Sequence, residues 1–326
     1  MAINSHLKYT IPPAVILSIL YRPFFSKLDL YRLAFLITVA VTATIPWDDY
    51  LIRQRIWTYP SNVILGPKLL SIPAEEVFFF FIQTYNTTLL YFILGRTSFY
   101  PRYLVGDSPE KPENLVPKIV GQIIIGFLTA TGFVLTNKGG EGTYLGLILA
   151  WAGPFCLMLW TFAHQFLAGL PFINTLVPIA VPTLYLWVVD TLALQRGTWS
   201  IESGTKIGVH LWNGFDIEEA LFFLLTNTMI VFGLVAFDNA LAIIQTFPHL
   251  FRTVPEIPSP ALLVKALMVP TSSYDADRIK GIQQAVSRLQ RKSRSFFLAS
   301  STFEGRLRID LILLYVEFPT NLRYVG

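Results

Sequence analysis

The stretch PAEEVFFFF at residues 73–81 places two adjacent glutamates at the start of a strongly apolar segment. The pattern recurs at residues 216–223, which read DIEEALFF. Both copies have Glu-Glu followed three positions later by Phe-Phe, and Glu218 minus Glu75 gives an offset of 143 residues. A repeated acidic pair in front of an apolar run is the feature that any account of this chain has to explain.

The composition is that of a membrane protein. Hydrophobic residues make up 53% of the 326 positions and charged residues only 14%, whereas soluble domains carry about 25% charged residues. The net charge of +4 comes from Lys and Arg in loops and in the C-terminal tail. We therefore assign it to membrane orientation and expect no nucleic-acid partner. The lone Cys156 excludes internal disulfides and a cysteine-based zinc site.

Seven apolar runs have about 20 residues, the length that crosses roughly 30 Å of hydrocarbon. The predicted fold class is therefore all-α, a polytopic membrane protein with about seven transmembrane helices. The first run is the weakest, because it is short and contains Pro12 and Pro13. The predicted spans are residues 4–21, 30–46, 73–95, 117–136, 143–168, 171–194 and 217–246.

The second and third spans, with the loop between them, resemble the sixth and seventh. Asp49 and Asp190 lie at or near the end of the first helix of each unit, and Trp57 and Trp199 lie in the connecting loops. The third and seventh spans are four crossings apart, so both glutamate pairs should face the same side of the membrane. This predicts two parallel repeats related by a pseudo-two-fold axis along the membrane normal. The repeats are predicted at about residues 1–95 and 143–246.

Two interpretations of the acidic pairs remain open. Acids in the first turn of a helix complement its macrodipole, and proline at the first helical position loses no hydrogen bond, so the pairs fit an ordinary helix start. Ionisable groups at membrane depth are costly and tend to be functional, and the presence of two copies favours this second interpretation. It makes Glu75, Glu76, Glu218, Glu219, Asp49 and Asp190 the candidate catalytic residues, and Phe79, Trp57, Trp199 and Phe222 the candidate substrate-lining residues.

Paired carboxyl groups at an apolar boundary indicate acid chemistry. Desolvation strengthens the hold of a carboxyl group on its proton, and a second carboxylate beside it adds to this. Such a group can protonate a poorly basic centre, and aromatic faces can stabilise the cation that forms. These properties fit acid-initiated chemistry on an alkene dissolved in the bilayer. The four histidines are scattered and no dinucleotide-binding glycine motif is present, so neither a metal site nor a bound dinucleotide is expected.

These motifs resemble the fungal bifunctional lycopene cyclase/phytoene synthase family. The resemblance covers about residues 1–245 and rests on PAEE at 73–76, PWDD at 46–49 and the repeated Glu-Glu at 218–219. The cyclase half of that family is similar to the two small subunits of heterodimeric bacterial and archaeal cyclases fused in tandem. The resemblance implies lycopene β-cyclase activity in carotenoid biosynthesis. It also implies that lycopene, other carotenoids, membrane lipids and other carotenoid enzymes are partners, and that the cyclase uses no cofactor.

The resemblance also implies roles for the acids. Glu75, with Glu76 as its partner, is expected to protonate the terminal double bond of a ψ end group. An internal double bond then attacks the carbocation, and Glu218 or Glu219 removes a ring proton to leave a β-ionone ring. The second copy has an aspartate in place of Pro73, so we expect the first copy to be catalytic if only one is.

The C-terminal part has a different character. KSRSFFLA at residues 292–299 and RIDLILLY at 308–315 resemble the opening helices of the phytoene synthase half, an all-α prenyl synthase. Residues 316–326 lack the Asp-rich motif that binds magnesium in the family, so magnesium is expected only in an intact synthase and prenyl transfer is expected to be lost. The predicted domains are a transmembrane domain at 1–246, a linker at 247–275 and a truncated synthase-like segment at 276–326.

The distribution of Lys and Arg predicts the orientation of the chain in the membrane. Lys and Arg are balanced between the two sides in the short loops, so the basic tail decides the orientation. The tail is expected to be cytosolic, and the membrane is expected to be an endomembrane.

A retinal photoreceptor needs a Schiff-base lysine in its last span, and residues 217–246 contain none. The remaining alternative is a proton-coupled transporter or a non-enzymatic membrane scaffold, because parallel repeats also build transporters.

Overall fold

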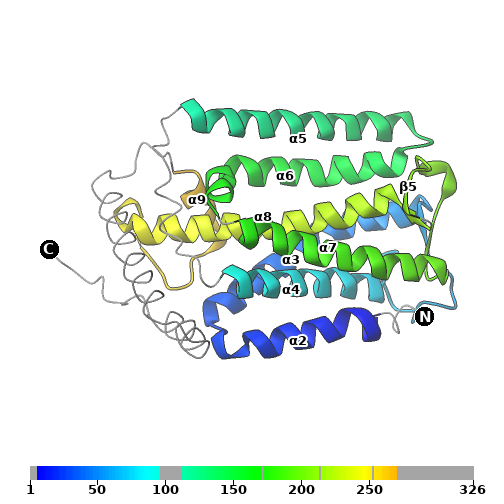
Figure 1. The fold of residues 1–326 in the computed structure, drawn as a ribbon, viewed down its shortest axis with the longest axis horizontal. Helices are drawn as coiled ribbons and strands as arrows, with labels where there is room; N and C mark the ends of the chain where they lie inside the picture. Colours follow the sequence, from blue (N-terminus) through cyan, green and yellow to red (C-terminus); the bar gives the residue numbers. More distant parts are fainter. Residues whose placement is uncertain (1–5, 96–111, 171, 213, 252, 270–326) are drawn as a thin grey trace, which may run out of the picture.

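The computed structural model describes residues 6–95, 112–170, 172–212, 214–251 and 253–269, which form a bundle of roughly parallel and antiparallel helices (Figure 1). Within these ranges six helices are long and apolar enough to cross a membrane, by length and composition. The all-α polytopic fold is confirmed. The six helices are α3 (Lys27–Arg53), α4 (Ala74–Gly95), α5 (Pro112–Lys138), α6 (Thr143–Gly169), α7 (Phe172–Gln195) and α8 (Ile217–Thr246).

The first predicted span is shorter than expected. It consists of a π-helical turn at His6–Thr10 and the 11-residue helix α2 (Ile11–Tyr21). Pro12 and Pro13 occupy the first turn of α2, where their missing N–H groups leave no hydrogen bond unmade. At 1.5 Å per residue, α2 is about 16 Å long, roughly half the hydrocarbon thickness. Within the described residues, six of the about seven predicted spans reach membrane length, and the first is shorter.

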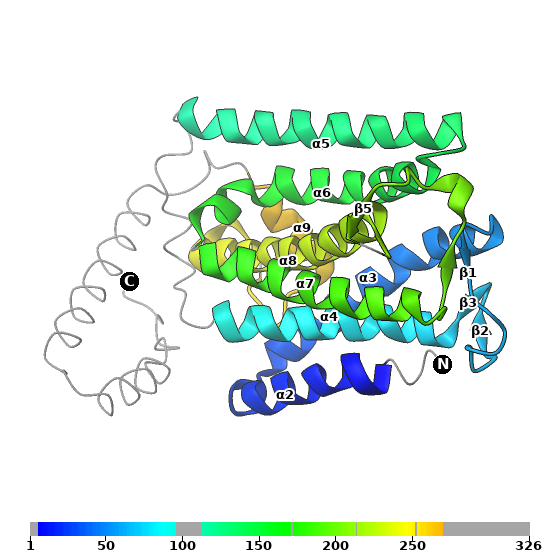
Figure 2. The same ribbon diagram turned by 45° about the vertical axis from the view of Figure 1, so that its right-hand side comes forward.

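Successive helices alternate in direction, and the short strands gather at one end of the bundle (Figures 1 and 2). Helix α3 ends and α4 begins at this end, and α7 ends and α8 begins there too. The two glutamate pairs open α4 and α8. They therefore lie at the same end of the molecule, which is the parallel arrangement that the spacing predicts.

Each repeat places a small hairpin before its second helix. Strand β2 (Lys68–Leu69) pairs with β3 (Ile72–Pro73) before α4. Strand β5 (His210–Trp212) pairs with β6 (Phe215–Asp216) before α8. A third antiparallel pair joins the two repeats, and its strands are β1 (Trp57–Thr58) and β4 (Ser200–Ile201).

Contacts between equivalent residues locate the pseudo-two-fold axis. In the β1–β4 pair, Thr58 lies opposite Ser200, 142 residues later, and their hydroxyl oxygens are 2.7 Å apart. Between α4 and α8, Gln83 Nε2 donates to Thr226 Oγ1, 143 residues later, at 2.8 Å. Because equivalent residues meet at two levels, the axis runs along the bundle between the repeats.

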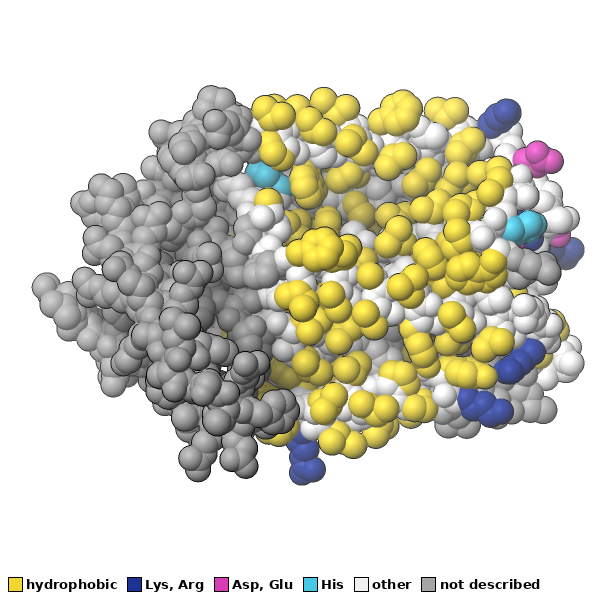
Figure 3. All heavy atoms as spheres, viewed as in Figure 1, with side chains coloured by type: hydrophobic (Ala, Val, Ile, Leu, Met, Phe, Trp, Pro, Cys, Tyr) yellow, Lys and Arg dark blue, Asp and Glu magenta, His cyan; other side chains and the backbone are white. Residues whose placement is uncertain are grey.

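The side chains divide the bundle into an apolar belt and polar ends. Hydrophobic side chains cover the middle of the visible face, and Lys and Arg lie mostly at the end that carries the strands (Figure 3). Inside, one aromatic-rich core cluster lies at the strand end around Trp47, Trp57 and Phe222. A larger aliphatic cluster fills the other end, between α4, α6 and α8. An apolar belt of this kind is what a bundle exposes to lipid.

Helix α5 lies on the outside of the bundle and packs mainly on α6 (Figure 1). Glycine allows this close approach: a Cβ atom on Gly132 would lie 2.6 Å from the backbone nitrogen of Ala150. On the other helix, a Cβ atom on Gly146 would lie 2.7 Å from that of Thr136. Packing through small residues is typical of membrane helices. No described residue of α5 belongs to either core cluster.

The described part of the predicted linker is packed against the bundle. It contains a 3-10 turn at Pro248–Leu250 and the helix α9 (Pro260–Leu267), which contacts α8. The side chain of Ser259 caps α9 by accepting from the backbone N–H of Leu262 at 3.3 Å, and proline at the first helical position suits a helix start. Residues up to 269 thus form part of the fold, whereas the predicted synthase-like segment lies outside the described residues.

Candidate active site

In each repeat the hairpin ends directly before a helix, and the glutamate pair lies in the first turn of that helix. Strand β3 ends at Pro73 and α4 begins with the next residue, while β6 ends at Asp216 and α8 begins with the next. Backbone N–H groups in a first helical turn have no partner within the helix, and the positive end of the dipole favours acids there. The helix-start interpretation therefore explains how carboxyl groups are tolerated at this depth.

The first glutamate of each pair holds a loop. Glu75 Oε1 accepts the backbone N–H of Leu65 at 2.5 Å, and Glu218 Oε1 accepts that of Ile207 at 2.7 Å. Both carboxyl groups are buried. The matched contacts give these two glutamates the same structural task in the two repeats.

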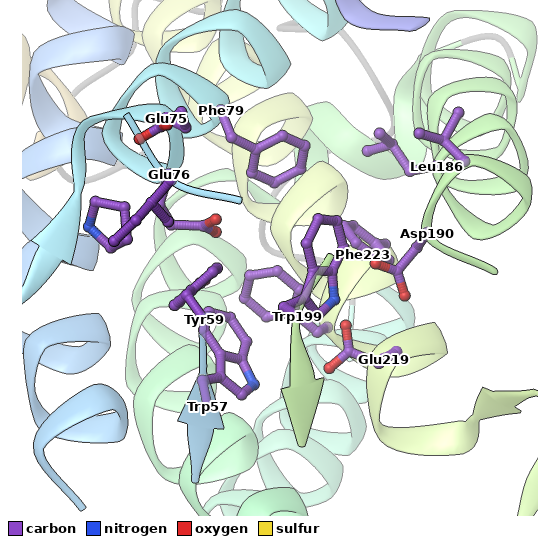
Figure 4. A pocket seen from close by; sticks show the side chains of 14 residues that line it. Trp57, Tyr59, Glu75, Glu76, Phe79, Leu186, Asp190, Trp199, Glu219 and Phe223 are labelled. Carbon is purple, nitrogen blue, oxygen red and sulfur yellow. The ribbon is translucent and has the colours of Figure 1, made fainter. Parts of the chain in front are cut away.

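The second glutamate of each pair faces a common cavity. Glu76 reaches into it from α4, and Glu219 enters from α8 together with Asp190 of α7 (Figure 4). The cavity has a volume of about 50 Å³, and Glu76 is near enough to Glu219 for their charges to interact. In Figure 4 the carboxyl group of Glu75 points away from that of Glu76. The site therefore combines one acid from each repeat.

Two tyrosines orient the inward-facing glutamates. Tyr59, which follows β1, donates a hydrogen bond to Glu76, and Tyr144 of α6 donates one to Glu219. Burial, together with the neighbouring carboxylates Glu76, Asp48 and Glu219, raises the pKa of Tyr59 well above its usual value. Tyr59 thus stays a phenol and acts as a hydrogen-bond donor.

An aspartate lies beside each inward-facing glutamate. Asp190 interacts electrostatically with Glu219, and Asp48 of α3 with Glu76. Both aspartates are almost fully buried, with exposures of 2% and 0%. Carboxyl groups packed together away from water share protons rather than all ionising. The cluster can therefore both supply and accept a proton.

Asp49 lies outside the cavity wall. Its Oδ1 accepts the backbone N–H of Ser71 at 2.9 Å, and its Oδ2 pairs with Arg53 Nε at 2.8 Å. Asp48 takes the place expected for Asp49, because helix α3 continues past Pro46 to Arg53 and turns Asp48 inward. The constant offset could have found it, since Asp48 precedes Asp190 by 142 residues, as Trp57 precedes Trp199.

The four predicted substrate-lining residues all lie in the cavity wall. Trp57 packs edge-on against Phe222 with ring centroids 5.6 Å apart, and Phe79 packs edge-on against Phe223 at 6.1 Å. Of the Phe run, Phe79 alone faces the cavity, because Phe80 is buried at the helix interface and Phe78 and Phe81 are exposed on the surface. Trp199 completes the wall beside Trp57 (Figure 4).

Tyr59 and Tyr144 were not predicted as site residues from the sequence. Tyr59 lies two positions after Trp57 on an extended segment, so strand alternation would have placed both on one face. Tyr144 is fully buried at the start of α6, 75 residues before Glu219, and no motif links the two. Only the packing of α6 against α8 reveals that contact.

No protein-family model and no solved structure matches this chain. It is 60% identical over 311 residues to the bifunctional lycopene cyclase/phytoene synthase of Leptosphaeria maculans, covering 95% of this chain and 54% of the relative. Proteins of the same name from Pyrenophora tritici-repentis and Phaeosphaeria nodorum are 60% and 59% identical, again over 95% of this chain and 53% of each relative. The chain spans about half the length of the curated relatives it matches. Over 95% of its length the chain is thus a relative of the fungal bifunctional lycopene cyclase/phytoene synthases.

Proposed function

We propose that the chain is a lycopene β-cyclase of carotenoid biosynthesis. The observation that carries the proposal is the convergence of two carboxyl groups, one from each repeat, on one aromatic-lined cavity in a membrane bundle. The names of the relatives, which include a lycopene cyclase, agree with it. Acid-initiated ring closure needs an acid, a base and a wall that tolerates positive charge, and the cavity offers all three.

The second glutamates suit the chemistry better than the first. Glu75 also lines the cavity, but one of its oxygens binds a loop N–H group, as one oxygen of Glu218 does, whereas Glu76 and Glu219 are held by tyrosine hydroxyls at the cavity. A general acid must lie within hydrogen-bond reach of the atom that it protonates. The proposal therefore moves the acid from Glu75, the residue expected from the sequence, to Glu76.

The reaction proceeds in three balanced steps. Glu76 gives its proton to the terminal double bond of a ψ end group, which forms a C–H bond and leaves a tertiary carbocation. An internal double bond attacks the cation, a C–C bond closes the ring, and the positive charge moves into the ring. Glu219, beside Asp190, takes a ring proton and the electron pair of that C–H bond becomes the ring double bond. The net change is an isomerisation.

Aromatic faces stabilise the intermediate. Trp57, Trp199 and Phe79 present rings to the cavity, and the negative face of an aromatic quadrupole attracts a cation within about 6 Å. Tyr59 and Tyr144 hold the two glutamates in place by hydrogen bonds. The acid and the base then need no movement between steps, which favours the reaction.

The test is to express the full chain in a bacterial host that accumulates lycopene. The pigments are then extracted and separated by chromatography. We expect γ-carotene and β-carotene. Persistence of lycopene, with the protein shown in the membrane fraction, would contradict the cyclase and leave the transporter or scaffold as the explanation for the acids. Incubation with geranylgeranyl diphosphate and magnesium tests the second activity, phytoene synthesis. We expect no phytoene, and the residues on which this expectation depends lie outside those that the structure describes.

We propose an endomembrane location with a cytosolic C-terminal tail. Six membrane-length apolar helices support a membrane location, and the basic tail supports the orientation. Limited proteolysis of sealed microsomes is expected to remove the tail while the bundle stays intact. Protection of the tail until the vesicles are opened would reverse the orientation.

A further inference from the structure

A second, larger cavity runs along the bundle away from the acids. It is a groove between α3 and α6 with α8 as its floor, and its volume is about 320 Å³. Its mouth faces the membrane side, where Val39 and Met158 are 42% and 47% exposed. Helix α9 closes the end farthest from the acids. The groove therefore has a closed end, an open side and one end near the candidate active site.

Phe222 connects the two cavities because its ring lines both. It stacks with Trp151, which lines the groove, at 6.3 Å between ring centroids, and with Trp47 at 5.6 Å. An engineered cavity of about 150 Å³ binds benzene, whereas the acid cavity has only about 50 Å³. A six-membered ring thus fits between the acids only when a wall residue moves, and Phe222 is the wall shared with the groove.

The shape of the groove suits an elongated molecule. Its floor extends from Phe222 to Ala240 on α8, a distance of about 27 Å at 1.5 Å per residue. Small residues line it, among them Ala40, Ala43 and Gly233. At Gly233 helix α8 lies close to α3, because a Cβ atom there would lie 2.9 Å from Leu36 Cδ1 and the Leu36 side chain would have to move.

The lining described here is mostly hydrocarbon, and most of its polar side chains already have hydrogen-bond partners. Thr44 Oγ1 donates to the carbonyl of Ala40 at 2.8 Å, and Thr84 Oγ1 to that of Phe80 at 2.9 Å. The remaining polar side chains, Gln83 and Thr226, bond to each other, and Trp151 Nε1 donates to the carbonyl of Ala43. A ligand with several polar groups would leave most of them unpaired here, which favours an unsubstituted hydrocarbon chain.

We propose that this groove binds the linear polyene chain of the substrate, extended along α8 with one end group at Phe222. The inference rests on the proposed function and names the site that presents the end group to Glu76 and Glu219. Displacement of Phe222 admits the end group to the acids, while the rest of the chain stays between α3 and α6. The groove thereby selects long, linear, apolar substrates over compact ones.

The test measures lycopene binding to the full chain in lipid nanodiscs by quenching of tryptophan fluorescence, since Trp151 lines the groove. Ala40→Phe and Ala43→Phe fill the groove and are expected to weaken binding at least tenfold. Ala34→Phe is the matched control, because Ala34 lies on the same helix, is exposed and does not line the groove. Equal lycopene binding by the wild type, Ala40→Phe and Ala43→Phe would overturn the proposal, as would an equal loss in Ala34→Phe.

A second measurement does not depend on filling the groove. Met158→Cys places a thiol at the mouth, and lycopene is expected to slow its labelling by a membrane-permeant maleimide at least fivefold. Phe133→Cys on α5, 52% exposed and away from the groove, is the control, and the native Cys156 is buried. Labelling of Met158→Cys at one rate with and without lycopene would overturn the groove as the site. Wild type that binds lycopene without converting it would refute the cyclase and leave the groove standing.

Discussion

The two repeats share a backbone plan but surround their inward-facing glutamates differently. Glu76 receives its hydrogen bond from Tyr59 in its own repeat's loop, whereas Glu219 receives one from Tyr144 at the start of α6. Glu76 is half-buried, and Glu219 is 3% exposed. Duplication has kept the positions of the acids while making their surroundings unequal.

The residues that precede the pairs widen the difference. Pro73 precedes the first pair, while Asp216 precedes the second and binds Lys206 Nζ and His210 Nδ1, each at 2.8 Å. The second copy therefore has a charged cluster that the first copy lacks. Two carboxyl groups in unequal environments suit a reaction in which one gives a proton and the other takes one.

The largest expected effect comes from removing either inward-facing acid. Glu76→Gln and Glu219→Gln are each predicted to lower lycopene conversion by roughly 10²- to 10⁴-fold, because general acid and base groups contribute about that much. The double variant should be little worse than either single one, since both act in one reaction. If each repeat were an independent site, each single variant would keep about half the activity. Pigment ratios and rates in isolated membranes decide between these outcomes.

The matched controls are the two glutamates that bind loop N–H groups. Glu75→Gln and Glu218→Gln keep an oxygen that can accept the loop N–H, so conversion is predicted to stay within about tenfold of the wild type. Loss of activity in Glu75→Gln with an active Glu76→Gln would return the role of acid to Glu75.

A smaller effect is expected at the aspartates. Asp190→Asn removes the carboxyl group beside Glu219 and is predicted to lower the rate about tenfold or more, the effect of about 1.4 kcal/mol on a barrier. Asp49→Asn is its control, because Asp49 binds Ser71 and Arg53 outside the cavity. Equal rates for the two variants would remove Asp190 from the site.

Loss of the tyrosine hydroxyls should have a comparable or lesser effect. Tyr59→Phe and Tyr144→Phe each delete a hydrogen bond to a carboxyl group, about 1.5 kcal/mol, or roughly tenfold in rate if the glutamate is then mispositioned. We expect the larger change for Tyr144, which is fully buried. A loss of folded protein without any change in rate per folded molecule would assign both tyrosines to stability alone.

The smallest effect is predicted for the charged cluster of the second repeat. Asp216→Asn weakens contacts with Lys206 and His210, whose side chains are 21% and 52% exposed. Partly exposed ion pairs contribute about 1 kcal/mol or less, so the free energy of unfolding should fall by no more than that. Denaturant unfolding in mild detergent measures it, and a drop of several kcal/mol would show that the cluster holds the hairpin to α8.

The membrane spans and the repeat could be predicted because both depend on the order of residues along the chain and not on contacts between distant segments. Runs such as residues 217–246 contain enough apolar residues to cross a bilayer whatever their neighbours are. The run at residues 4–21 was the weakest of the predicted spans, and its described part forms only a π-helical turn and an 11-residue helix. The constant offset of the glutamates predicted a shared membrane face without any contact being known.

The division of labour within each glutamate pair could not be predicted. Glu75 and Glu76 are adjacent, and the direction of each depends on where the loop N–H of Leu65 lies. Likewise, Tyr144 reaches Glu219 through the packing of α6 on α8. Such contacts join segments far apart in the chain, and composition and spacing carry no information about them.

Helix α5 bears on how a protein of this kind can arise. Each repeat comprises three helices, α2 to α4 and α6 to α8, and the third ends at the opposite face from where the first begins (Figure 1). Tandem duplication of a gene for such a unit would invert the second copy unless one more crossing were inserted, and α5 supplies that crossing. At the axis, Thr58 faces its equivalent Ser200, which is where a residue of an ancestral homodimer would have met itself. The fused chain would then correspond to a dimer in one polypeptide. Its two halves could diverge, one into the proton donor and the other into the proton acceptor.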